Sequence, residues 1–291
     1  MITFTRSQDL NDYLDQHRKN QLRIGFTPTM GALHEGHFSL VQRSINENDL
    51  SICSIFVNPT QFNEKSDLDK YPRTVESDQK GLEAVGCDIL YLPDVEDVYP
   101  EGSDYELDLD LEGLDSTMEG AKRPGHFEGV VQVVKRLLDI TQCDRLYMGQ
   151  KDFQQFTIIN HMIEKMSIPV ELVVCATVRD EDGLAMSSRN RRLTPEHRKR
   201  ASIIYRVLMQ AKEWLEIGRS PIEISTKAME YLSIPGFSPE YFDLIDGKSL
   251  HKAQNIEDTA LIVACTAVWA GEVRLIDNMI LKGSLPGQLN S

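Results

Sequence analysis

Short apolar runs alternate with amphipathic runs along residues 22–178 of this 291-residue chain. Apolar runs bounded by turn residues are typical of buried strands, whereas apolar residues repeated at helical spacing indicate helices. The predicted strands are residues 22–26, 50–57, 87–92, 145–148 and 170–178. The predicted helices are residues 39–46, 74–85, 127–140 and 153–166. This alternation predicts an α/β fold: a mainly parallel sheet with helices on both faces.

An acidic segment, residues 94–120, interrupts the alternation. Within it, residues 105–111 alternate strictly between polar and apolar, which predicts a half-exposed strand or hairpin at the edge of the sheet. We interpret the negative charge of the segment as a solvated face.

A different pattern begins after Val178. Thr194-Pro195 is typical of a helix N-cap followed by proline at the first helical position, and it opens a long predicted helix that runs to residue 217. A helix over residues 220–232, a loop over 233–239 and strands at 241–245, 260–270 and 273–280 follow. We therefore predict two domains, residues 1–178 and a smaller α+β domain over residues 179–291.

The composition excludes several classes of partner. A net charge of −14 argues against a nucleic-acid partner, because phosphate backbones attract clustered Lys and Arg. The five cysteines are scattered, odd in number and mostly within apolar runs, which indicates buried thiols in a reducing cytoplasm. Residues 1–4 do not resemble the start of a signal peptide, and no apolar run approaches the ~20 residues of a membrane span. We expect a cytoplasmic protein that binds no membrane.

Residues 27–38 read Thr-Pro-Thr-Met-Gly-Ala-Leu-His-Glu-Gly-His-Phe and join the first predicted strand to the first predicted helix. His34 and His37 lie at this junction, where backbone N–H groups and the helix dipole attract anions, above all phosphate. Gly31 and Gly36 remove Cβ atoms where the chain turns tightly or approaches a ligand. The pattern indicates a site for a triphosphate that loses pyrophosphate; a plain helix cap is the alternative. Zinc is disfavoured, because the spacing is one residue shorter than His-Glu-x-x-His and no third ligand is near.

Two polar side chains follow the second predicted strand. Gln61, in Phe-Val-Asn-Pro-Thr-Gln-Phe, can offer a donor and an acceptor to a small polar substrate, or it is an ordinary loop residue. Asp78 is suited to Mg²⁺, which uses one or two carboxylates together with phosphate oxygens. A solvated helix face explains Asp78 nearly as well.

Residues 148–155 form another predicted strand-to-helix turn. Lys151 is placed to neutralise a phosphate or a carboxylate. Asp152 either caps the helix or accepts hydrogen bonds from ribose hydroxyls. Gln154 and Gln155 are neighbours on the first helical turn, so at most one of them should reach the site.

The loop between the two predicted domains contains Ser187, Ser188 and Arg189. Two hydroxyls and a guanidinium in sequence can clamp a phosphate, and a loop at a domain junction can close over a nucleotide. The alternative is an N-cap turn with a surface arginine.

In this order, the segments resemble the pantothenate synthetase family, the AMP-forming pantoate–β-alanine ligases. The resemblance rests on residues 28–37, 56–62, 71–73, 123–130, 149–155 and 178–190. The His-x-Gly-His motif alone is shared with a wide nucleotidyltransferase superfamily, whereas the full series is specific to this family. The resemblance implies a Rossmann-like N-terminal domain that carries the site, a smaller C-terminal lid domain and a homodimer.

The resemblance also implies roles for individual residues. Those it places at ATP are Met30, Gly31, Ala32, Leu33, His34, Glu35, Gly36, His37, Gly149, Gln150, Lys151, Asp152, Val178, Met186, Ser187, Ser188 and Arg189. Those it makes catalytic are His34, His37, Lys151 and Arg189. It places Gln61 and Gln155 at pantoate, Gln61 also at β-alanine, and Asp78, less directly, at Mg²⁺. Position 150 departs from the family, where Glu is frequent, and we expect the Gln150 side chain to face solvent.

The implied reaction is the ATP-dependent condensation of (R)-pantoate with β-alanine through pantoyl adenylate, with release of AMP and pyrophosphate. The main alternative is another His-x-Gly-His nucleotidyltransferase that acts on a phosphorylated small molecule and has no need of Gln61 and Gln155. An aminoacyl-tRNA synthetase is disfavoured by the net charge and by the lack of a spare tRNA-binding domain. A nucleotide-binding regulator without turnover is disfavoured by the joint presence of Lys151, Asp152, Ser187, Ser188 and Arg189.

Overall fold

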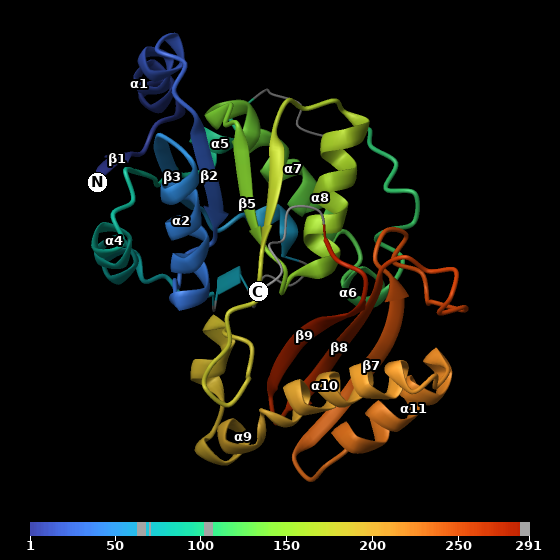
Figure 1. Ribbon diagram of the computed structural model, residues 1–291. Helices are drawn as coiled ribbons and strands as arrows, with labels where there is room; N and C mark the ends of the chain where they lie inside the picture. Colours follow the sequence, from blue (N-terminus) through green and yellow to red (C-terminus); the bar gives the residue numbers. More distant parts are fainter. Residues whose placement is uncertain (63–67, 70, 102–106, 286–291) are drawn as a thin grey trace. The chain divides into compact units, whose positions relative to one another are not determined.

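The computed structural model describes residues 1–62, 68–69, 71–101 and 107–285, which form two compact units (Figure 1). The first unit comprises Met1–Gly149 and Ile158–Cys175. The second comprises Gln150–Thr157 and the chain from Ala176 onward. The contacts thus divide the chain after Cys175 and assign the turn that carries Lys151 to the second unit. The domain boundary after residue 178 stays a prediction.

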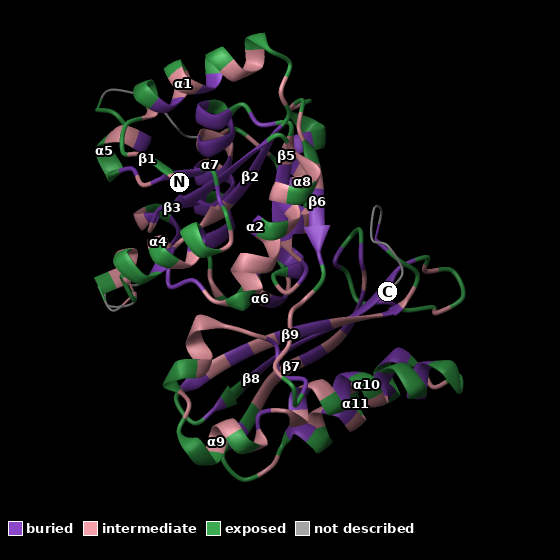
Figure 2. Cartoon of the chain, turned by 60° about the vertical axis from the view of Figure 1, so that its left-hand side comes forward, coloured by how far each residue is buried: buried purple, intermediate pink, exposed green. Residues whose placement is uncertain are grey.

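A six-stranded sheet forms the centre of the first unit, with strand order β1-β4-β3-β2-β5-β6 and every neighbouring pair parallel. The strands are β1 (Ile2–Phe4), β2 (Ile24–Thr29), β3 (Leu50–Ile55), β4 (Ile89–Tyr91), β5 (Arg145–Gly149) and β6 (Glu171–Cys175). Every residue of β3 and β4 is buried, as expected where helices cover both faces of a parallel sheet (Figure 2). The predicted α/β fold class is confirmed.

The face of the sheet on which each helix of this unit lies follows from the way the chain crosses from one parallel strand to the next. They are α1 (Ser7–Lys19), α2 (Glu35–Glu47), α4 (Val75–Ala84), the short α5 (Val95–Val98) and α6 (Met118–Lys122), and α7 (His126–Thr141); α8 (Phe153–Lys165) begins in the second unit and ends in the first. From β2 the chain moves to β3 and then β4, and from β4 it returns to β5 on the other side of β2. Right-handed crossovers therefore place α2 and α4 on one face and α7 on the other, and α1 packs against α7. The direction reverses between β2 and β5, which makes their carboxyl ends the topological switch point where such sheets bind ligands.

The second unit is an antiparallel sheet, β7-β8-β9, with helices packed against it. Its strands are β7 (Phe237–Asp246), β8 (Ile262–Ala270) and β9 (Val273–Lys282), and its helices are α9 (Pro195–Arg200), α10 (Ile203–Glu216) and α11 (Pro221–Leu232). Helices α10 and α11 contact each other and the sheet, so that Leu208, Ile224 and Val268 share one apolar core. The α+β character predicted for the C-terminal part is confirmed. None of the helices in the described part of the chain is long and apolar enough to cross a membrane.

Two predicted elements differ in the structure. The edge strand expected at residues 105–111 falls partly outside the described residues, and residues 107–111 lie in no strand; the edge beside β4 is occupied by β1 instead. The long helix expected from Thr194 to residue 217 is two helices. Thr194 caps α9 as predicted, but the Ala201 N–H bonds to the Arg198 carbonyl and the Ile204 N–H to the Ala201 carbonyl. These three-residue spacings tighten the chain and end the first helix, an effect that apolar periodicity does not reveal.

Candidate active site

The loop between β2 and α2 turns sharply at two consecutive residues. Gly31 and Ala32 have φ values of +80° and +50°, in the left-handed region that glycine enters without strain and other residues enter at a cost. A Cβ atom on Gly31 would lie 3.1 Å from Asp78 Oδ2 and 3.1 Å from Ile55 Cγ2. The absence of a side chain at Gly31 therefore serves both the turn and the close packing beside it.

Asp78, on α4, holds this loop in place. It is 3% exposed, and its carboxylate accepts hydrogen bonds from the Ala32 N–H at 2.8 Å, the Leu33 N–H at 2.9 Å and the Thr74 hydroxyl at 3.0 Å. A carboxylate has about four acceptor positions, and three of them are occupied here. This geometry makes Asp78 an anchor of the loop and leaves little capacity for a metal ion. Its role as a Mg²⁺ ligand stays a prediction.

The paired histidines stand at the N-terminus of α2, as the sequence predicted. His34 is the N-cap residue, and its Nδ1 accepts a hydrogen bond from the Gly36 N–H at 3.1 Å. The His34 N–H donates in turn to Nδ1 of His37 at 3.4 Å, and the two ring centroids lie 4.1 Å apart. Because both Nδ1 atoms accept, each neutral ring carries its proton on Nε2 and is a donor there. Two imidazole donors thus join the positive end of a helix dipole, a combination suited to a polyphosphate.

Gln61 and Met30 are brought together at the same end of the sheet. Gln61 ends the short 3₁₀ helix η1 (Pro59–Gln61), is 7% exposed, and its Nε2 lies 3.0 Å from the Met30 sulfur. Its Oε1 accepts a hydrogen bond from Asn58 Nδ2 at 3.2 Å. Asn58 also donates to the Gly129 carbonyl and accepts from the Tyr99 hydroxyl, both at 3.1 Å. The Gln61 amide is therefore held in one orientation at the edge of the site.

His126 supports Gln61 from α7, although the sequence analysis assigned it no role. Its Nδ1 lies 2.9 Å from the Gln61 carbonyl oxygen, and its Nε2 lies 3.1 Å from Nη1 of Arg123. A guanidinium can only donate, so Nε2 accepts and Nδ1 carries the proton that it donates to Gln61. Arg123 and His126 both belong to the motif at residues 123–130. Their place in that motif was the one sequence signal that could have assigned them a role at the site.

The Lys151 turn belongs to the second unit. The Lys151 amine lies 3.7 Å from the Asp152 carboxylate, and Asp152 is exposed. Gln150 is 9% exposed, and its Nε2 donates to the Asn278 Oδ1 at 3.3 Å, so the expectation that Gln150 faces solvent was wrong. Farther along, Gln154 is buried and Gln155 is half-buried, as expected for neighbours on a helix that face different ways.

A hairpin-like loop precedes the predicted phosphate clamp. The Met186 N–H donates to the Val178 carbonyl at 3.0 Å, which brings together two of the residues that the resemblance places at ATP. Arg179 pairs with Ala185 in a β-bridge. Ser187 caps the 3₁₀ helix η2 (Ser188–Arg192), and its hydroxyl accepts from the Arg189 N–H at 3.3 Å.

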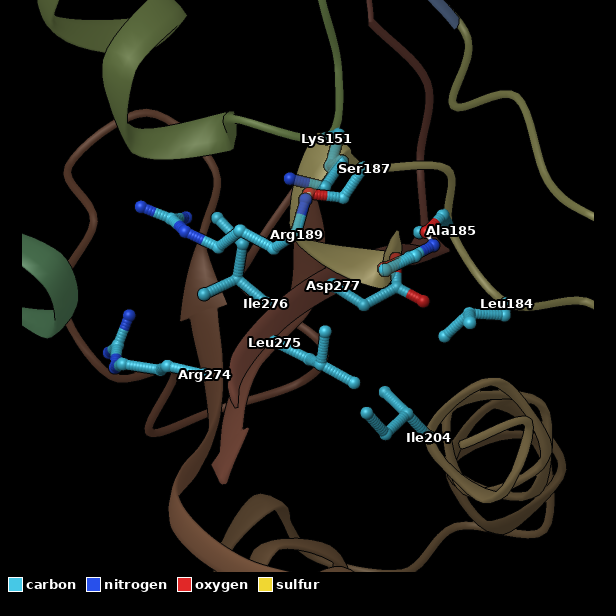
Figure 3. A pocket seen from close by; sticks show the side chains of 11 residues that line it. Lys151, Leu184, Ala185, Ser187, Arg189, Ile204, Arg274, Leu275, Ile276 and Asp277 are labelled. Atoms are coloured by element: carbon cyan, nitrogen blue, oxygen red, sulfur yellow. Dashed lines mark hydrogen bonds between the residues drawn. The ribbon is translucent and has the colours of Figure 1, made fainter. Parts of the chain in front are cut away.

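A pocket in the second unit gathers residues that the sequence offered separately. Lys151, Ser187 and Arg189 line it together with Arg274 and Asp277 of β9 (Figure 3). Figure 3 shows Lys151, Ser187 and Arg189 among the side chains that line it. Arg274 is paired with Glu240 at 2.6 Å and Asp277 with Arg179 at 2.6 Å, so Lys151, Arg189 and the Ser187 hydroxyl are the lining groups best suited to an anionic ligand.

The cysteine thiols lie in the interior of the protein. All five cysteines are free and buried, as predicted, and burial raises the pKa of Cys87 to about 11 and that of Cys143 to about 12. Within the described ranges, no three His, Cys, Asp or Glu side chains are grouped as a metal site would require.

The parallel sheet, its switch point and the paired histidines at α2 define a protein of the nucleotidyltransferase-like class. A family model narrows this: that of the pantoate–β-alanine ligases matches residues 2–280. The chain belongs to this family.

Individual relatives agree over nearly the whole length. The pantothenate synthetase of Bacteroides fragilis is 44% identical over 277 residues, which cover 95% of this chain and 98% of that protein. The crystal structure of the Thermus thermophilus pantothenate synthetase superposes with a TM-score of 0.90 at 39% identity, covering 97% of this chain and all of the other. The Francisella tularensis pantoate–β-alanine ligase, complexed with β-γ ATP and β-alanine, has a TM-score of 0.79 at 36% identity and covers 97% of this chain and 98% of its own.

Proposed function

We propose that this protein condenses pantoate with β-alanine at the expense of ATP and releases AMP and pyrophosphate. Membership of the pantoate–β-alanine ligase family supports the proposal over residues 2–280. The observation that carries it within the molecule is the His34–His37 pair, held at the N-terminus of α2 with both Nδ1 atoms engaged.

The chemistry requires activation of a carboxylate, because an amide does not form from a carboxylate and an amine in water. In the first step a pantoate carboxylate oxygen bonds to the α-phosphorus of ATP, the bond from that phosphorus to the bridging oxygen breaks, and pyrophosphate leaves. In the second step the β-alanine nitrogen bonds to the acyl carbon of pantoyl adenylate, the acyl C–O bond breaks, and AMP leaves as the nitrogen loses a proton. Neither step needs a covalent bond to the protein, so catalysis is positioning and charge stabilisation.

We assign the phosphates to His34, His37, Lys151 and Arg189. The Nε2 donors of the two histidines suit the β- and γ-phosphates, and His37 is placed to give a proton to the departing pyrophosphate. The Lys151 amine and the Arg189 guanidinium stabilise the charge that develops at the α-phosphorus and on the leaving group. The pocket that they share with Ser187 supports this assignment.

We assign the other ligands to the remaining predicted residues. Gln61 and Gln155 hold pantoate, and Gln61 also borders β-alanine; the fixed amide of Gln61 supports its part. The ATP contacts of the nucleoside and ribose side fall to the backbone around Gly149 and to Asp152, Val178 and Met186. We also propose that the protein is cytoplasmic and forms a homodimer; sedimentation equilibrium of the purified protein tests the dimer, and cell fractionation tests the location.

Magnesium enters the proposal as the counter-ion of ATP. The residues near the loop fit a direct ion poorly, because Asp78 is buried and already accepts three hydrogen bonds. We therefore route no step through the ion. Its chemistry when bound to ATP is to neutralise phosphate charge and so favour attack on phosphorus.

The test is AMP release from Mg-ATP with pantoate and β-alanine omitted in turn. We expect AMP only when both substrates are present and ATP–pyrophosphate exchange with pantoate alone. Exchange that needs neither substrate, or no AMP with both, contradicts the proposal. In that case a phosphorylated acceptor should be sought, as for other His-x-Gly-His nucleotidyltransferases.

A further inference from the structure

Asn278 on β9 is joined to the Lys151 turn by an unusually complete set of hydrogen bonds. It is 2% exposed. Its Nδ2 donates to the Gln150 carbonyl at 2.9 Å and to the Lys151 carbonyl at 2.8 Å, while its Oδ1 accepts from Gln150 Nε2 at 3.3 Å. One buried amide thus binds two consecutive carbonyls and the side chain of the first of these two residues.

Few other side chains can do this. A primary amide carries two N–H donors and an acceptor in one plane, which is what two neighbouring carbonyls and one amide donor require. Aspartate has the same shape but no donor when ionised, and a carboxylate would face the two carbonyl oxygens. In a buried place these carbonyls have no water to replace the lost donors.

The residue before Asn278 holds the loop that leads to the predicted phosphate clamp. Asp277 forms a two-point ion pair with Arg179, with Nη1–Oδ2 at 2.6 Å and Nη2–Oδ1 at 3.0 Å. The Arg179 guanidinium also donates to the Gly183 carbonyl at 3.1 Å and stacks 4.6 Å from the centre of the Tyr205 ring. A dipeptide of β9 therefore fixes both the Lys151 turn and the loop that leads to Ser187, and Asp277 itself lines the shared pocket (Figure 3).

We propose that Asn278 is a positioning residue that sets the backbone of Lys151, and through it the place of the Lys151 amine at the reacting phosphate. The inference rests on the proposed function, because it takes Lys151 as the cation at that phosphate. Lys151 lies between β5 and α8 in sequence but is held by β9. A displacement of about 1 Å at a catalytic group slows an enzyme by about 100-fold, so loss of the Asn278 amide should act on turnover.

The test is a double-mutant cycle of Asn278→Ala and Lys151→Ala in pantoate-dependent ATP–pyrophosphate exchange. We expect Asn278→Ala to lower kcat by about 10- to 100-fold with a smaller change in the KM for pantoate. In the Lys151→Ala background the same substitution should change kcat by less than about threefold, because residues that act through one group are not additive. If Asn278→Ala does not fold, Asn278→Ser keeps one hydroxyl donor and enters the same cycle.

The matched control is Thr266→Val. Thr266 is also buried in this sheet, is paired with Asp277 across β8 and β9, and its hydroxyl donates a hydrogen bond to the Tyr241 carbonyl at 2.8 Å. Among the residues that the structure describes, no hydrogen bond joins Thr266 to the Lys151 turn. It should lower the melting temperature and leave kcat within about twofold, as expected of a substitution that removes one buried hydrogen bond away from the site.

The outcomes separate the inference from the proposed function. Wild-type protein without pantoate-dependent exchange overturns the proposed function, and the inference with it. If wild-type exchange is normal, three results each overturn the inference alone. The first is that the effects of Asn278→Ala and Lys151→Ala on kcat multiply in the double variant, and the second is that either substitution leaves kcat unchanged. The third is that Thr266→Val slows exchange as much as Asn278→Ala.

Discussion

Replacing Asp78 with asparagine removes the charge beneath the histidine loop and preserves the shape of the side chain. The wild-type carboxylate accepts three hydrogen bonds, two of them from the backbone of Ala32 and Leu33. Oδ2 of Asp78 accepts from the Ala32 N–H and the Thr74 hydroxyl, and Oδ1 accepts from the Leu33 N–H. The amide of Asp78→Asn has one acceptor oxygen, so in either orientation its NH₂ group must face a backbone N–H. The loop then loses at least one of its hydrogen bonds to residue 78, and two hydrogen-bond donors face each other.

The magnitude follows from these contacts. A hydrogen bond to a charged group contributes about 1.5–3 kcal/mol, and a neutral one about 0.5–1.5 kcal/mol. Loss of one bond and weakening of the other two therefore destabilise the protein, and relief of the buried charge of Asp78 offsets a part of this. We expect a net loss of about 2–4 kcal/mol in the free energy of unfolding.

Urea unfolding and pantoate-dependent exchange measure the two consequences. The unfolding midpoint should fall while the slope with urea is unchanged, and the KM for ATP should rise because the loop before His34 loses its anchor. The matched control is Glu76→Gln, which changes an exposed carboxylate in the first turn of the same helix. It should change the free energy of unfolding, and the free energy that corresponds to the KM for ATP, each by no more than about 0.5 kcal/mol.

Two results would refute the reasoning about Asp78. The first is an unfolding midpoint for Asp78→Asn equal to that of Glu76→Gln. The second is a variant of normal stability whose half-saturating Mg²⁺ concentration has risen tenfold or more, which would identify Asp78 as the magnesium ligand that the resemblance implied. An anchor of the loop leaves the Mg²⁺ dependence unchanged.

Three further predictions concern other parts of the molecule. His37→Ala should slow pantoate-dependent exchange by about 100-fold or more, the scale of a lost acid or charge-stabilising group, and near-normal exchange would remove His37 from its role. Gly129→Ala should destabilise the protein by about 1–3 kcal/mol in urea unfolding, as overpacking does, because the new Cβ would lie 2.5 Å from the Thr60 carbonyl oxygen; a stabilised variant, the usual effect of alanine in a helix, would contradict this. The hydrogen bond from Arg198 lowers the pKa of Asp182, so wild type should exceed Asp182→Asn in stability above the ordinary Asp pKa, by under about 1 kcal/mol for so exposed a pair. That difference should vanish as the pH falls through the lowered pKa, and its persistence in acid would show another cause.

Most of the fold of the first unit could be predicted because its information is local. Apolar runs between turn residues predicted the strands β2 to β6, and their alternation with helices predicted that these strands run parallel. The prediction failed where local pattern and tertiary context disagreed. Residues 107–111 alternate like a strand but pair with no other strand, whereas Ile2–Phe4, too short to carry a pattern, finds an edge beside β4 and forms one.

By itself, the sequence predicted which residues carry the chemistry, and it determined that the paired histidines stand at a turn between a strand and a helix. The glycine at position 31 and the histidine pair at the start of α2 follow from backbone geometry and the helix dipole, which act over a few residues. Only the tertiary structure decided what holds them. Asp78 lies 46 residues from Ala32, and Asn278 lies 128 from Gln150. The physical reason is that a buried polar group must find its partner wherever packing brings one, and no periodicity along the chain records that partner.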